Sequence, residues 1–460
     1  MLRKILQWLF LATVMLAPLP FASNRPWSWS LLATLVGILV VAEALSSYST
    51  STSQNQFLKR IAPGLMMFIA ISLWVLLQTI TGMPDGFAHP LFLEASTLIG
   101  TSSLFALSVD PNAGMTAFMR LLTYAGVFWL ATRFCRDADF AATTLRVFVT
   151  ISGVYALYGL MVFFLDLKMI LWFEKWAYQN DLTSTFVNRN TYATFAGLGV
   201  LSSIALGFEL ISRKLHQNLG YKETIRVFLD EAFTKAWMPF LCLLLTLTAL
   251  FLTHSRGGFL STSMAVLVLL LALSYAKVIP RKISYFITGL VVLGSIFAFS
   301  MSGDIVIKRL EHTSFASSIR DEVYTQTIEA INANPVLGTG YGTYEQAFMA
   351  YKTLDLIQSN WDKAHNSYLE LAMELGIPAT IVFCTIFLWL MGIYLYGLMR
   401  RRRNKFYAAL GLAATALVAA HAIVDFSLQI PGLTVAYTLI AGLAWSQSWP
   451  TRRTRKSAKE

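Results

Sequence analysis

Long apolar runs constrain the fold of this chain more than any other feature. About twelve stretches of roughly 17 to 25 residues are apolar enough to cross the hydrocarbon core of a bilayer as helices. Charged residues make up 13% of the chain, against about 25% in soluble proteins. The sequence therefore predicts an all-α polytopic membrane protein. The approximate limits of the runs are 5–22, 29–46, 62–81, 114–132, 140–164, 191–212, 237–253, 259–276, 283–300, 376–399, 406–424 and 432–448.

The first apolar run follows two basic residues, Arg3 and Lys4, as in a secretory signal peptide. The tripeptide 21–23, Phe-Ala-Ser, is a poor cleavage site, and further apolar runs follow, so we interpret this run as an uncleaved first helix. The three cysteines lie far apart at Cys135, Cys242 and Cys384. This spacing predicts neither a disulfide framework nor a metal site.

The formal net charge of +11 would suggest a nucleic-acid partner in a soluble protein. In a membrane protein, basic residues gather in cytoplasmic segments. If the N-terminus is cytoplasmic, most of the 36 basic residues fall on that side, including the run 400–403 and the tail 451–460. These runs are therefore expected to lie beside anionic membrane lipids rather than to bind nucleic acid.

The predicted topology divides the chain into four parts. Residues 1–300 hold transmembrane helices one to nine, and residues 376–450 hold helices ten to twelve. Between them, residues 301–375 form a large polar loop region with short helices, which the charge distribution places in the periplasm. Residues 451–460 form the basic cytoplasmic tail. The segment 82–113 also falls on the outer face, and its sequence indicates no role.

Arg256 occupies a turn, residues 253–258, between two apolar helices on the predicted outer face. Its planar guanidinium suits phosphate, and the start of the following helix favours anions. The next two residues, Gly257 and Gly258, are expected to let a ligand approach the backbone closely. The turn therefore predicts a phosphate-binding site.

Arg189 lies in the segment 186–192, just before another span. Asn188 or Asn190 is expected to cap the helix that follows, because asparagine side chains accept hydrogen bonds from the first backbone amides. Two interpretations stay open for Arg189. It either binds a ligand or extends along the membrane interface to keep its charge in water.

His365 is followed by an amphipathic stretch that leads into the tenth apolar run. A histidine at the start of a helix lies in a positive potential, which lowers its pKa and favours the neutral ring. His365 is therefore a candidate general base, although a single histidine is more often structural. Asn366 follows it directly.

Arg320 begins a second amphipathic pattern, which ends at the glycine-rich segment 334–342. The glycines of this segment predict a tight turn near a ligand or another helix, with Tyr341 among them. The segment is not a phosphate-binding Walker loop, because no Lys-Ser/Thr pair follows it. Arg320 and Lys363 are further basic candidates on the outer face.

Taken together, these residues resemble the O-antigen ligase and polymerase superfamily of bacterial envelope glycosyltransferases. The likeness runs from about residue 60 to 440 and includes one large periplasmic loop late in a twelve-span chain. It is strongest at Phe186–Asn190, Ser255–Gly258, Asn334–Gly340 and His365–Gly376.

Ligases of this superfamily tend to carry a spaced histidine motif. It has a histidine, then Asn, Ser or Gln, then nine residues before a glycine, and Gly, Thr or Tyr three residues later. His365, Asn366 and Gly376 fit this spacing, whereas Ala379 departs from it. The departure weakens the likeness to ligases more than the likeness to the superfamily.

The resemblance implies a function and a site. The donor is then a glycan on undecaprenyl diphosphate, the acceptor is lipid A-core or another glycan, and the site faces the periplasm from a bacterial inner membrane. Arg189 and Arg256 would hold the diphosphate, and His365 would activate the acceptor hydroxyl without a metal or cofactor. The supporting residues are Asn188, Asn366, Arg320 and Tyr341.

The sequence leaves several alternatives open. Within the superfamily, a polymerase or an O-oligosaccharyltransferase would use the same donor. A transporter of lipid-linked glycans is a different class, recognised by broken helices and polar groups in the middle of the membrane. Arg120 and Arg146, which lie within predicted spans, keep this alternative open.

Overall fold

A computed structural model describes residues 1–47, 54–84, 86, 88–100, 106–215, 221–301, 319–353, 356 and 361–450. Regular structure in these residues is almost entirely helical. The strands β1 (Met169–Ile170) and β2 (Phe173–Glu174) form one short antiparallel hairpin, in which Met169 pairs with Glu174. The all-α class predicted from the sequence is confirmed.

Each predicted apolar run coincides with one helix. These helices are α1 (Leu2–Leu16), α2 (Pro26–Ser47), α3 (Gln54–Thr79), α5 (Pro111–Phe134), α6 (Ala138–Phe164), α7 (Arg189–Leu215), α9 (Trp237–Leu252), α10 (Arg256–Tyr275), α11 (Arg281–Met301), α15 (Ile377–Arg400), α16 (Lys405–His421) and α17 (Pro431–Gln447). The remaining named helices are short: η1 (Phe21–Ser23), α4 (Pro90–Ile99), α8 (Tyr221–Thr234), α13 (Tyr344–Phe348), η3 (Met349–Tyr351), α14 (Ser367–Leu375) and η5 (Ser427–Gln429). Residues 319–333 are also helical.

Among the described residues, six helices are long and apolar enough to cross a membrane: α2, α3, α6, α7, α10 and α15. The apolar helices α9 and α16 are shorter than these. The chain is therefore a multi-pass membrane protein, and the count of about twelve spans stays a prediction. The helix formed by the first apolar run ends at Leu16, before the predicted limit of the run at residue 22. It ends there because Pro18 and Pro20 lack the amide hydrogens that a helix needs.

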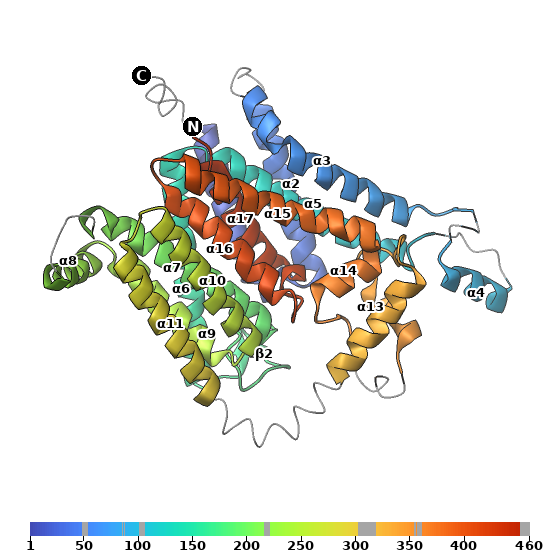
Figure 1. Cartoon of the computed structure of the whole chain (residues 1–460). Coiled ribbons are helices and arrows are strands. Elements are labelled where there is room, and N and C mark those ends of the chain that lie inside the picture. The colour runs from blue at the N-terminus through green and yellow to red at the C-terminus, as the bar shows by residue number, and fades with distance from the viewer. Residues whose placement is uncertain are drawn as a thin grey trace.

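The centre of the helical assembly is formed by α7, α10, α16 and α17. In the apolar 18-residue stretch of α7, about 83% of the residues are buried inside the protein. Small residues allow the helices to approach closely: a Cβ added at Gly197 would lie 2.4 Å from Thr262 Oγ1 of α10. Figure 1 shows α7, α10 and α16 side by side, and α16 also packs against α17. This packing brings the first residues of α7 and α10 to the same end as the last residues of α16.

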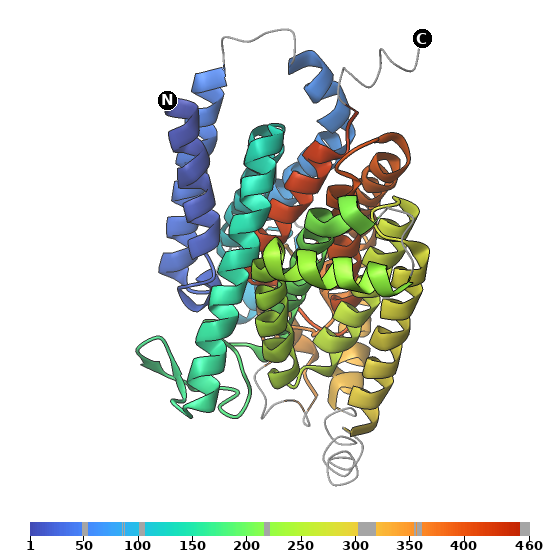
Figure 2. The same cartoon turned by 90° about the vertical axis from the view of Figure 1, so that its left-hand side faces the viewer.

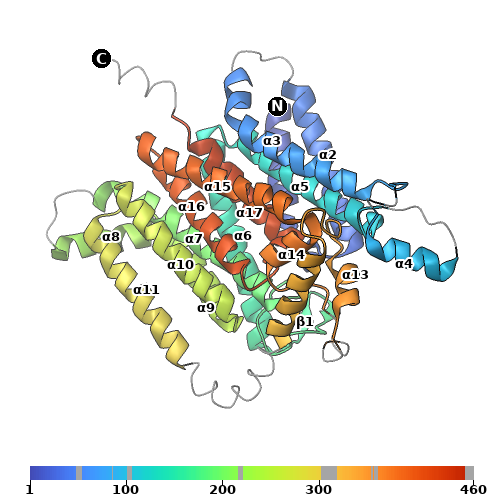
Figure 3. The same ribbon diagram turned by 45° about the vertical axis from the view of Figure 1, so that its right-hand side comes forward.

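The two ends of the helical assembly carry different segments of the chain. Figure 2 shows the N-terminus at one end of the helices and the β1–β2 connection, drawn in teal, at the other. The short helices α13 and α14 lie beside the same end as this connection (Figures 1 and 3). They pack with the helix 319–333 in one apolar cluster around Val323, Tyr344, Phe348 and Met373.

The glycine-rich segment 334–342 packs against α14, and no ligand is needed to explain its glycines. The amides of Thr339 and Gly340 donate to the carbonyls of Met373 and Glu374, at 2.9 Å each. A Cβ on Gly338 would lie only 2.3 Å from the carbonyl oxygen of Glu374. The sequence left open whether this turn lies near a ligand or near another helix. The structure supports the second interpretation.

Candidate active site

Polar side chains connect the first turns of α7 and α10 with the segment that follows α16. Ser255 caps α10 by accepting a hydrogen bond from the Gly258 amide at 3.2 Å, and its hydroxyl donates to Asn190 Oδ1 at 2.9 Å. The amide nitrogen of Asn190 donates to Asp425 Oδ1 at 3.1 Å. Three segments that are distant in sequence are therefore held together at one end of the helices.

Asn188 caps α7, as one of the two sequence predictions proposed. Its Oδ1 accepts from the amides of Asn190 at 2.7 Å and Thr191 at 3.3 Å. The cap makes Arg189 the first residue of α7, and Arg256 is likewise the first residue of α10. Both guanidinium groups thus lie where the helix macrodipole adds positive potential.

Arg189 is held by an aspartate that the sequence analysis did not single out. Asp181 Oδ2 accepts from Arg189 Nη1 at 2.8 Å, and Asp181 Oδ1 lies 2.8 Å from His254 Nδ1. The guanidinium also lies 5.4 Å from the ring centroid of Tyr178. Arg189 Nε is buried without a hydrogen-bond partner in the described part of the chain. Arg189 is therefore a fixed side chain with a donor to spare, which disfavours the interfacial interpretation.

Arg256 is exposed, and the described ranges place no ion-pair partner beside it. The two glycines after it do not leave the space that the sequence analysis expected. A Cβ on Gly257 would lie 3.2 Å from His421 Nε2, and one on Gly258 would lie 2.5 Å from the Cβ of Ala193. That expectation was wrong, because the glycines let α10 pack against α16 and α7.

His365 lies directly before the N-cap of α14, with a φ angle of +54°. Asn366 is that cap, because its Oδ1 accepts from the amides of Tyr368 and Leu369. The ring of His365 lies edge-on to Phe426 at 4.9 Å between centroids and to Trp361 at 5.6 Å. Its side chain is only 18% exposed, so the ring is held on two sides and open to a limited approach.

The carboxylate nearest to His365 belongs to Asp425, which the sequence analysis also missed. His365 Nδ1 lies 3.9 Å from Asp425 Oδ1, beyond hydrogen-bonding distance, and the aspartate side chain is fully buried. Nδ1 is itself buried without a hydrogen-bond partner in the described part of the chain. Ser427 donates to the second carboxylate oxygen, and the Asp425 carbonyl accepts from Ser367 Oγ at 3.0 Å. The carboxylate is thus fixed in place facing the ring. An acidic residue between two predicted spans is costly to bury without a partner, so this position could have identified Asp425 from the sequence.

The surroundings of His365 favour the neutral ring. Burial lowers the pKa of His365, the negative charge of Asp425 opposes this, and the positive charge of Arg320 adds to the lowering. The ring is therefore an available base at neutral pH. Among the described residues, no group of three histidine, cysteine, aspartate or glutamate side chains could hold a metal ion.

The structure brings Arg320 close to the site but not Tyr341. Burial lowers the pKa of His365, and the positive charge of Arg320 adds to this effect. Burial raises the pKa of Tyr178, and the charge of Arg320 opposes that rise. Tyr341 instead packs in a separate apolar cluster with Ile71 and Leu121. Its amide donates to Gln78 Oε1 at 3.2 Å, so it supports the fold of the glycine-rich segment.

Residues 241–384 match the family model described as "O-Antigen ligase". The matched range begins in α9 and ends in α15, and it contains Arg256, His365 and Asn366. Arg189 and Asp425 lie outside it. A comparison with curated proteins finds no match to the chain. The match supports the superfamily that the sequence motifs resemble.

Proposed function

We propose that this chain, a member of the O-antigen ligase and polymerase superfamily, transfers a glycan from undecaprenyl diphosphate to a sugar hydroxyl on the periplasmic face of the inner membrane. The acceptor that we propose is lipid A-core, which makes the reaction O-antigen ligation. One observation carries the proposal: His365 faces the buried carboxylate of Asp425. Asn190 and Ser255 connect this pair with the helix starts that carry Arg189 and Arg256.

The two arginines bind the diphosphate of the donor. Breaking the bond between the anomeric carbon and the phosphate oxygen leaves the electron pair on the diphosphate, so negative charge grows there in the transition state. Arg256 contributes an exposed guanidinium, and Arg189 contributes its Nε, which has no hydrogen-bond partner among the described residues. Charge-assisted hydrogen bonds from such groups are stronger than those between neutral groups.

His365 removes the proton from the acceptor hydroxyl. Because Nδ1 faces Asp425, Nε2 is the nitrogen that receives this proton. The hydroxyl oxygen then bonds to the anomeric carbon from the side opposite the departing diphosphate, which inverts the anomeric configuration. Asp425 stabilises the imidazolium that forms, as carboxylates do for other catalytic histidines.

The experiment that tests the proposal supplies the purified protein with labelled undecaprenyl-diphosphate glycan and either lipid A-core or additional donor. Ligation predicts that the label moves to lipid A-core. Growth of longer glycans on the donor lipid alone would instead indicate a polymerase, and label on a peptide acceptor would indicate an O-oligosaccharyltransferase.

The pH dependence of transfer should report the pair of His365 and Asp425. His365 must be neutral to accept a proton, so the rate should fall as the pH drops through its pKa, which burial keeps below the usual value of about 6.5. Asp425 raises this pKa. Asp425→Asn should therefore move the acidic limb to still lower pH and also reduce the maximal rate, because the imidazolium loses its partner.

Single-turnover rates between about pH 5 and 8 measure this shift. Glu174→Gln, which changes an exposed carboxylate on β2, is the matched control and should keep the wild-type profile. An acidic limb that stays in place in a folded Asp425→Asn protein would contradict the pairing.

A further inference from the structure

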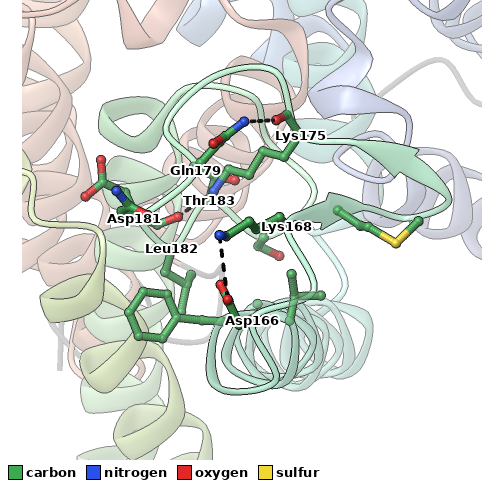
Figure 4. Close-up of a pocket in the computed structure, with 13 residues that line it drawn as sticks. Asp166, Lys168, Lys175, Gln179, Asp181, Leu182 and Thr183 are labelled. Carbon is green, nitrogen blue, oxygen red and sulfur yellow. Dashed lines mark hydrogen bonds and ion pairs between the residues drawn. The ribbon is translucent and has the colours of Figure 1, made fainter.

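A small cavity lies where the end of α6 meets the connection to α7, and it is lined in part by Asp181, the ion-pair partner of Arg189. Its volume is about 250 Å³, below the roughly 300 to 1,000 Å³ of sites for drug-sized ligands. The cavity is about large enough for one sugar ring. Figure 4 shows the side chains that line it, among them Asp166, Lys168, Lys175 and Gln179.

Both lysines of the cavity already have polar partners. Lys168 Nζ lies 3.6 Å from Asp166 Oδ2, and Lys175 Nζ donates to the carbonyl of Asp181. The side-chain amide of Gln179 donates to the Lys175 carbonyl at 3.2 Å. A phosphate would need cations without such partners, whereas the hydroxyl groups of a sugar need donors and acceptors together.

The cavity also has apolar lining residues. Among them are Val162 and Phe163 from the last turn of α6, and Leu182. A sugar ring has apolar C–H faces between its hydroxyl groups, so residues of this kind complement the ring while the polar residues complement its edge. Sites for small ligands commonly combine apolar walls with a few placed polar groups.

Asp181 connects the cavity with the proposed diphosphate site. Its carboxylate binds Arg189 and His254, and its backbone carbonyl accepts from Lys175 on the cavity side. Asp181 is therefore the residue that separates the cavity from a diphosphate bound by Arg189. The sugar directly bonded to that diphosphate is the part of the donor that can reach the cavity.

We propose that this cavity is a subsite for the sugar residue attached to the donor's diphosphate, and that it makes the protein selective for sugar-bearing lipid over bare lipid diphosphate. This inference rests on the proposed function, since it assumes that Arg189 and Arg256 hold the diphosphate. The subsite adds selectivity for the donor, and the arginines supply the affinity for its charge.

The test compares binding of three probes to the full chain in lipid nanodiscs. They are undecaprenyl diphosphate and the same lipid carrying a single N-acetylglucosamine or galactose residue. Wild-type protein should bind at least one sugar-bearing lipid more tightly than it binds bare undecaprenyl diphosphate.

Val162→Trp, which fills the cavity, should abolish this preference. Lys168→Ala, which removes one exposed donor, should reduce it by about threefold to tenfold. Binding of bare undecaprenyl diphosphate should stay unchanged in both variants.

Glu174→Ala is the control, because Glu174 is exposed on the same hairpin and does not line the cavity. It should keep the wild-type preference. Equal binding of all three lipids by the wild type, or equal weakening of all three by Val162→Trp, would overturn the sugar subsite alone. Failure of the wild type to bind any of them would overturn the diphosphate site and this inference with it.

Discussion

His365→Ala should slow glycan transfer by roughly two to four orders of magnitude, the usual contribution of a positioned general base. Donor binding should remain near the wild-type value, because His365 belongs to the acceptor side and Arg189 and Arg256 hold the diphosphate. Single-turnover transfer with labelled lipid-linked glycan measures the first quantity, and binding of undecaprenyl diphosphate measures the second.

His89→Gln is the matched control for this experiment. His89 is also buried, but it directly precedes α4, where its ring accepts from the Leu91 amide and lies beside Asn334. This variant should retain transfer. If folded His365→Ala protein transferred glycan at a near-normal rate, the histidine would be structural and the mechanism would fail.

Arg256→Ala should be almost inactive, and Arg256→Lys should also be strongly impaired. A guanidinium donates two parallel hydrogen bonds to a phosphate group, whereas an ammonium is a point charge. Loss of one charge-assisted contact costs roughly 1.5 to 3 kcal/mol, or about one to two orders of magnitude in rate. Arg189→Ala should be comparably weak, because Arg189 also holds Asp181 at the edge of the site. The loss should appear in kcat as well as in donor affinity.

Arg25→Ala provides the comparison for these arginine variants. Arg25 lies over the ring of Trp176 at 5.0 Å, in contact with neither Asp181 nor Asp425, and its loss should change transfer little. Full activity of Arg256→Lys, or alanine variants that differ from wild type only in protein abundance, would make both arginines interfacial anchors. The diphosphate site would then have to include other cations, with Arg320 and Lys363 as the next candidates.

The helices could be predicted from the sequence because each depends on a local pattern. A run of apolar residues that is long enough to cross the bilayer also forms a helix in the structure, and Asn188 and Asn366 mark two helix starts through capping bonds to neighbouring amides. Arg189, Arg256 and His365 could be selected for a similar reason. Each is a polar residue at the boundary of an apolar run, where burial of charge is costly.

The partners of these residues could not be predicted from such patterns. Asp181 is only eight positions from Arg189, but it also meets His254 from 73 positions away. Asp425, which faces His365, accepts from Asn190 across 235 positions. Only the packing of α7, α10 and α16 brings these side chains together. The role of Gly257 and Gly258 was mistaken for the same reason, since a glycine that serves helix packing has the same sequence as one that leaves space for a ligand.

The most direct test of the central claim is the stoichiometry of the reaction in reconstituted vesicles. One measurement follows undecaprenyl diphosphate release and glycan attachment to lipid A-core at the same time. The account predicts that both rise together, with one diphosphate lipid released for each glycan attached, and that both are lost in His365→Ala. Movement of intact lipid-linked glycan across the bilayer, without diphosphate release or a new glycosidic bond, would contradict it and identify a transporter.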